Sequence, residues 1–137
     1  MRKLLAGILG LSILFLAMPL TAAPVGTSDQ EVKAVAEPIL ENLLAGFNQG
    51  NYAQYSKNFD ETLREAIPEE KFQQVRRELM KKLGSFKSKN YLGFLNQQAH
   101  TVVLWKGAFT DTQDDVLLKL VLSKRQDKVV VKGLWFQ

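Results

Sequence analysis

The sequence contains no cysteine and only one histidine, His100. The lack of cysteine excludes disulfide bonds, thiolate metal ligands and a lipid carried on a cysteine. One histidine leaves carboxylates as the remaining metal ligands, and their spacing fits no calcium-binding loop. A glycine-rich phosphate loop and a serine nucleophile elbow are missing as well. We therefore expect no metal, no cofactor and no covalent catalysis.

A large excess of positive charge is also lacking. The chain has 18 Lys and Arg residues against 14 Asp and Glu residues. Arg2 and Lys3 belong to the N-terminal segment described next, and without them 16 basic groups face 14 acidic groups, a net charge of about +2. This small surplus gives no basis for a nucleic-acid partner.

The N-terminus has the three parts of a secretory signal peptide. Arg2 and Lys3 precede an apolar run from Leu4 to Leu20, and small residues then lead to Ala23. Residues 1–23 are therefore expected to be a signal peptide, cleaved after Ala23. A retained membrane anchor is the alternative, although the run is short of the ~20 residues of a spanning helix. We expect an exported protein, periplasmic or secreted, without a stable membrane anchor after cleavage.

Residues 24–137 are enough for a single domain with one core. Ser28 and Glu31 form a capping box that begins a helix, and Gly50 is the expected left-handed stop. A second, short helix is predicted over residues 51–59, and a third over residues 68–84. Between them, residues 60–67 form a polar turn with at most one turn of helix.

The C-terminal half predicts four antiparallel strands. A weaker strand covers residues 85–98, and three strongly apolar strands cover 101–109, 116–122 and 129–136. Helices followed by strands indicate an α+β fold in which the helices cover one face of the sheet. Two-residue turn tips at 112–113 and 125–126 would place one set of residues on that inner face: Val103, Trp105, Phe109, Leu118, Leu120, Leu122, Val129, Val131 and Trp135.

Several short motifs resemble a family of small exported domains of unknown function. They are Gly50-Asn-Tyr52, Phe59-Asp-Glu61, Ile67-Pro-Glu-Glu-Lys-Phe72, Leu83-Gly-Ser-Phe86 and Val131-Lys-Gly-Leu-Trp-Phe136. That family belongs to the nuclear transport factor 2-like, or cystatin-like, superfamily. The resemblance implies three helices on a curved four-stranded antiparallel sheet, often with an apolar pocket. Members include cyclases, dehydratases and isomerases as well as non-catalytic binding domains, and many form dimers.

Asp60 is the weak catalytic candidate. It follows Phe59 and lies near Tyr52 and Tyr55, where a carboxylate can act as a general acid or base. A helix cap beside a solvated turn is the other explanation of this residue. His100 alternates away from the inner face, so we expect it at the outer surface.

A ligand pocket is predicted around two glycines inside strands. Gly107 and Gly133 would form a floor without side chains, and a bend in the sheet is the alternative explanation. The aromatic residues expected to surround this floor are Trp105, Phe109 and Trp135, with Tyr52, Tyr55 and Phe59 as the opposite wall. Such a pocket would suit an apolar or aromatic small molecule.

The outer face of the predicted sheet carries Lys106, Lys119 and Lys132, which the expected turns align side by side. Leu104 and Leu134 lie next to this lysine row. The row is either a solvated surface or part of a homodimer interface. Our functional hypothesis is an exported, non-enzymatic domain that binds a small molecule or an envelope protein partner. The alternative is a cofactor-free lyase or isomerase with an acid/base residue in the pocket.

Overall fold

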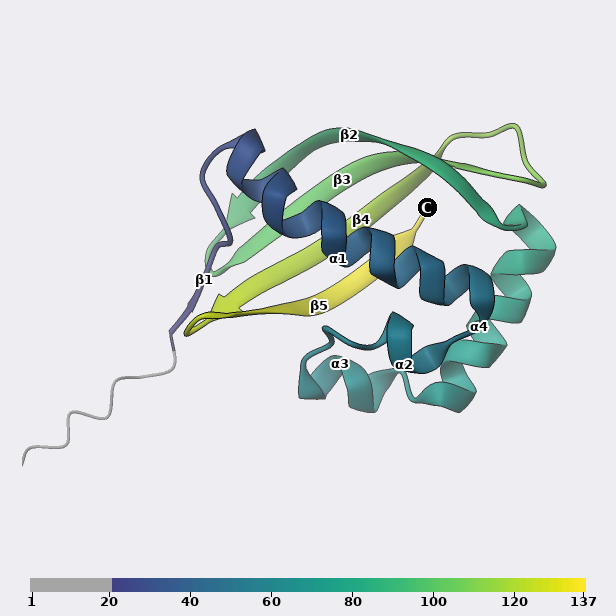
Figure 1. The fold of residues 1–137 in the computed structure, drawn as a ribbon, viewed down its shortest axis with the longest axis horizontal. Coiled ribbons are helices and arrows are strands. Elements are labelled where there is room, and N and C mark those ends of the chain that lie inside the picture. The colour runs from purple at the N-terminus through teal and green to yellow at the C-terminus, as the bar shows by residue number, and fades with distance from the viewer. Residues whose placement is uncertain (1–20) are drawn as a thin grey trace, which may run out of the picture.

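The computed structural model describes residues 21–137, so most of the predicted signal peptide, residues 1–20, lies outside the described residues. The described chain confirms the α+β class (Figure 1). Its elements are β1 (Ala22–Ala23), α1 (Asp29–Gln49), α2 (Tyr52–Tyr55), α3 (Glu61–Ala66), α4 (Glu69–Leu83), β2 (Phe86–Gln97), β3 (His100–Phe109), β4 (Val116–Arg125) and β5 (Lys128–Phe136). No helix within residues 21–137 is long and apolar enough to cross a membrane.

Local capping sets the helix ends, as the sequence predicts. The Ser28 hydroxyl accepts a hydrogen bond from the Glu31 amide at the start of α1, and the Glu31 carboxylate accepts from the Thr27 amide. Gly50 ends the helix with φ 69°. Gly84 ends α4 with a positive φ of 78° but an extended ψ of −154°, so its conformation is not the left-handed helical one of Gly50.

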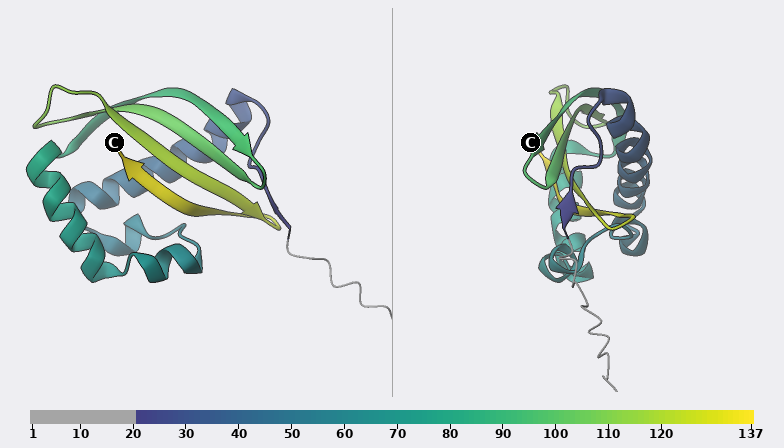
Figure 2. Two further views of the ribbon diagram at one scale, coloured as in Figure 1. Left: turned by 180° about the vertical axis from the view of Figure 1, so that it is seen from behind. Right: turned by 90° about the vertical axis from the view of Figure 1, so that its left-hand side faces the viewer.

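The sheet is an antiparallel meander from β2 to β5, and the two-residue β1 pairs with the end of β4. The strands curl around α1, which crosses one face of the sheet (Figure 1). No helix of residues 21–137 covers the opposite face, as the view from behind and the side view show (Figure 2). Helices α2, α3 and α4 gather at one end of the molecule, beside β5.

The core lies between α1 and the concave face of the sheet. The apolar stripe of α1 contributes Val32, Ala36, Leu40, Leu44 and Phe47, and the sheet contributes Val103, Trp105, Leu118, Leu120, Leu122 and Val131. The predicted inner face is therefore correct for β3 and β4. Burial of this apolar surface is the main stabilising contribution.

A turn tip at residues 112–113 would pair Val103 with Leu122, and this predicted register between β3 and β4 is wrong by two residues. Val103 pairs with Leu120, and Trp105 pairs with Leu118. The connection between these strands spans residues 110–115 and is longer than a tight two-residue turn. Side chains alternate with a period of two, so a shift of two residues leaves every side chain on its predicted face.

The register between β4 and β5 changes at a bulge. Val121 pairs with Gly133 and Leu122 pairs with Val131, which leaves Lys132 as an extra residue in β5. The alternation after Lys132 is therefore reversed. Leu134 pairs with Leu120 on the inner face, whereas Trp135 lies on the outer face with 44% of its surface exposed. The predicted faces of Leu134 and Trp135 are thus wrong.

The same bulge and shift abolish the predicted lysine row. Lys106 pairs with Leu117, and Lys119 pairs with Leu104 on one side and Trp135 on the other. The Lys119 ammonium lies 5.0 Å from the centre of the Trp135 indole, a cation–π contact. No two of the three lysines are therefore directly opposite each other on neighbouring strands.

Candidate ligand-binding pocket

The predicted glycine floor is not a cavity. A Cβ atom on Gly107 would lie 3.0 Å from Leu118 Cδ1, so the space beside this glycine is already filled by core side chains. A Cβ atom on Gly133 would lie 2.2 Å from the Trp135 indole. Gly133 leaves room for that ring on the outer face, and the predicted pocket at this position is therefore wrong.

Most of the aromatic residues predicted to bind a ligand have structural contacts instead. Trp105 is fully buried, and its indole nitrogen donates to Glu37 Oε1 at 3.0 Å. Phe109 is buried in the core, and Phe59 is buried with an edge contact to Tyr55. The Tyr52 hydroxyl donates to the Ile67 carbonyl oxygen at 2.6 Å.

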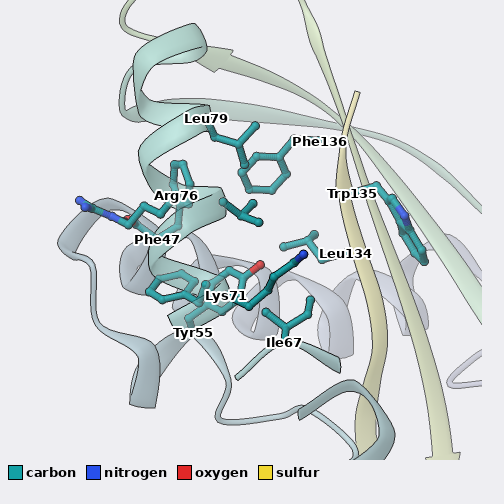
Figure 3. Close-up of a pocket in the computed structure, with 11 residues that line it drawn as sticks. Phe47, Tyr55, Ile67, Lys71, Arg76, Leu79, Leu134, Trp135 and Phe136 are labelled. Atoms are coloured by element: carbon teal, nitrogen blue, oxygen red, sulfur yellow. The ribbon is translucent and has the colours of Figure 1, made fainter. Parts of the chain in front are cut away.

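An apolar pocket lies instead at the end of the molecule where α4 meets β5 (Figure 3). Its volume is about 260 Å³. It is lined by Phe47, Tyr55, Ile67, Lys71, Phe72, Val75, Arg76, Leu79, Leu134, Trp135 and Phe136. Of the predicted ligand-binding residues, Tyr55 and Trp135 are in this set, and the Trp135 indole is on the far side of β5 from Leu134 (Figure 3).

The lining follows from two local patterns. On α4, Phe72, Val75 and Leu79 recur at the three-and-four spacing of one helical face. On β5, the reversed alternation after the bulge turns Leu134 and Phe136 inward. Buried Phe72 supports one wall, because its ring packs against Tyr55 with 4.4 Å between the ring centres. The spacing of apolar residues predicts the helical face from the sequence, whereas no sequence pattern indicates the bulge.

The pocket also contains three polar groups, and one of them has a structural role. The Arg76 guanidinium donates to the carbonyl oxygens of Phe47 at 2.6 Å and Asn48 at 2.8 Å. It thereby satisfies carbonyls at the C-terminus of α1, where a cation is favourable. Arg76 is consequently held by α1 and points away from the pocket in Figure 3.

The other two polar groups are Lys71 and the Tyr55 hydroxyl. Among the residues that the structure describes, Lys71 has no ion-pair partner and the Tyr55 hydroxyl has no hydrogen-bond partner. Burial raises the pKa of Tyr55 to about 12, with a smaller contribution from Tyr52. The phenol therefore keeps its proton at physiological pH and can donate a hydrogen bond.

Asp60 lies outside this pocket. Its Oδ1 accepts from the Leu63 amide at 2.8 Å and caps α3, and its Oδ2 accepts from Lys132 Nζ at 2.5 Å. Burial opposes ionisation, but the hydrogen bonds from Lys132 and Leu63 outweigh it and lower the pKa of this carboxyl. The arrangement corresponds to the capping explanation of Asp60.

A second polar cluster, which is partly buried, was not anticipated from the sequence. Glu37 of α1 accepts from Trp105 of β3 and forms an ion pair with Lys89 of β2. Burial again opposes ionisation, yet the hydrogen bonds from Lys89 and Trp105 lower the pKa of Glu37. In the sequence Glu37 reads as an ordinary polar residue of a helix, because its partners are far away along the chain.

Residues 21–137 bring no group of three His, Cys, Asp or Glu side chains together for a metal ion. His100 lies with Val102 and Val121 in a shallow groove on the outer face.

The molecule is thus a small α+β domain with one helix-covered sheet face and an apolar end pocket. Residues 41–128 match the model of a family described as protein of unknown function (DUF3887), and the chain belongs to that family. No curated protein and no solved structure matches the chain.

Proposed function

We propose that this protein is an exported, non-enzymatic binding domain that holds a small apolar molecule in the pocket between α4 and β5. The observation that carries the proposal is the pocket lining, which is mostly aliphatic and aromatic with few polar groups. Small-molecule sites in proteins have this composition. Export rests on the signal-peptide pattern of residues 1–23.

The placement of the carboxylates supports binding over catalysis. A general base that works near neutral pH needs a raised pKa and access to the substrate. Glu37 and Asp60 have lowered pKa values and are paired with Lys89 and Lys132. Neither carboxylate lines the pocket.

The curled sheet wrapped around α1 also supports the further proposal that the domain is a member of the nuclear transport factor 2-like superfamily (Figure 1). Non-catalytic binding domains are common on that fold, as the resemblance in the sequence implies. The fold alone does not define an activity, so the proposal depends on the pocket.

Titration with the neutral fluorescent probe N-phenyl-1-naphthylamine tests this proposal. The parent protein should give a saturable rise in probe fluorescence. Val75→Phe should weaken binding by more than about tenfold, because the larger side chain occupies the pocket. Gln74→Phe is the matched control, since Gln74 is the preceding residue of α4, is exposed and does not line the pocket. Failure of the parent to bind, or equal binding by both variants, would refute the proposal.

A further inference from the structure

The polar groups of the pocket differ in whether they have a hydrogen-bond or ion-pair partner. Arg76 is bound to two carbonyl oxygens of α1, whereas Lys71 and the Tyr55 hydroxyl have no partner within the described chain. In Figure 3 the Lys71 side chain reaches from α4 toward Leu134, along the apolar lining. The pocket therefore presents one free cation and one free hydroxyl beside an apolar wall.

Helix stability does not explain the position of Lys71. This residue lies in the first turn of α4, where the positive end of the helix dipole disfavours a cation. Glu69 and Glu70 are in the same turn, but side chains one or two positions apart on a helix do not face each other. An anion at the pocket mouth would gain from both the ammonium and the helix end.

The size of the pocket limits the rest of the ligand. A volume of about 260 Å³ is slightly below the ~300–1,000 Å³ of sites for drug-sized molecules. The space suits a short alkyl chain or a small aromatic molecule better than a lipid with four fused rings. The pocket walls, which include Phe72 and Leu79, offer only apolar contacts to the ring or alkyl chain of the ligand.

We infer that the pocket selects small organic acids, with the apolar body against α4 and β5 and the carboxylate held by Lys71. The protonated Tyr55 hydroxyl donates a second hydrogen bond to the same carboxylate. This inference rests on the proposed function and specifies its ligand class.

Octanoate and 1-octanol form a matched pair of probes, because they differ in the presence of the charged group. In calorimetric titrations at neutral pH the parent should bind octanoate roughly fivefold more tightly than 1-octanol, the size expected for a partly exposed ion pair. Lys71→Met should abolish this preference and leave 1-octanol binding unchanged. Lys71→Arg should retain the preference, and Tyr55→Phe should reduce it. Lys81→Met is the control, since Lys81 is an exposed lysine of α4 outside the pocket.

The outcomes separate this inference from the proposed function. Equal binding of the two probes to the parent, or an unchanged preference in Lys71→Met, would overturn the inference and leave the apolar pocket as a binding site. Binding of neither probe, together with no binding of N-phenyl-1-naphthylamine, would refute the proposed function and the inference that depends on it. Loss of the preference in Lys71→Met but not in Lys81→Met supports the inference.

Discussion

Asp60→Ala should lower the free energy of unfolding by about 2–4 kcal/mol, the sum of two losses. Removing the cap of α3 costs about 1 kcal/mol, because the Leu63 amide loses its acceptor. Leaving Lys132 without its partner costs about 1–3 kcal/mol. The larger loss of stability that follows when a fully buried ion pair is broken does not apply here. The reason is that 23% of the Lys132 side chain is exposed, so the ammonium can reach water.

Asp60→Asn separates the two contributions. Asparagine caps helices about as well as aspartate and has nearly the same volume, so this variant removes the charge alone. It should lose about 1–3 kcal/mol, less than the alanine variant. A double-mutant cycle with Lys132→Met measures the coupling between the two side chains directly. Urea unfolding followed by tryptophan fluorescence is a suitable assay, because Trp105 is fully buried in the core.

The pH dependence gives a second, independent check. The folded state lowers the pKa of Asp60 below its ordinary value of 3.8. The ion pair therefore contributes its full stability above about pH 5, and this contribution is lost as the pH falls through the folded-state pKa. The stability difference between parent and Asp60→Asn should be largest at pH 7 and shrink below about pH 4. A difference that is the same at pH 7 and pH 3, or an alanine variant within about 0.5 kcal/mol of the parent, would refute this account.

Two further predictions concern the outer face of the sheet. Gly133→Ala should displace the Trp135 indole, because the new Cβ atom would lie 2.2 Å from the ring, and tryptophan emission should shift to longer wavelength while the domain remains folded. An unchanged spectrum would contradict the packing of Trp135 over Gly133. Leu95 pairs with Val102 on the outer face and is 52% exposed, so we expect sedimentation to detect a homodimer at high micromolar concentration. Leu95→Glu should make it monomeric without changing its melting temperature, and a monomeric parent would exclude this dimer.

The features that the sequence predicted correctly are those with local causes. Ser28 caps α1 and Gly50 ends it through contacts within a few residues. The apolar faces of β3 and β4 follow from simple alternation, which a register error of two residues does not disturb. Each of these signals lies within a short segment of the chain.

The errors in β5 have a long-range cause. Nothing in residues 128–136 marks Lys132 as the extra residue of a bulge, since lysine is common on the solvent side of a strand. The bulge lies where a distant segment joins the edge of β5. The Asp60 amide donates to the Val131 carbonyl oxygen at 3.1 Å, and the Val131 amide donates to the Asn58 carbonyl oxygen at 2.7 Å. The Asp60 carboxylate then binds the Lys132 side chain beside that junction.

The bulge at Lys132 also connects the ion pair to the candidate pocket. Without an extra residue in β5, Leu134 and Phe136 would face outward and Trp135 would face α1. The observed reversal places Leu134 and Phe136 in the pocket wall opposite α4 and moves the indole to the outer face. Asp60 therefore supports the shape of the candidate pocket from outside it, because it holds the lysine at which the strand reverses its faces. Catalysis is not required to explain why a carboxylate lies at this position.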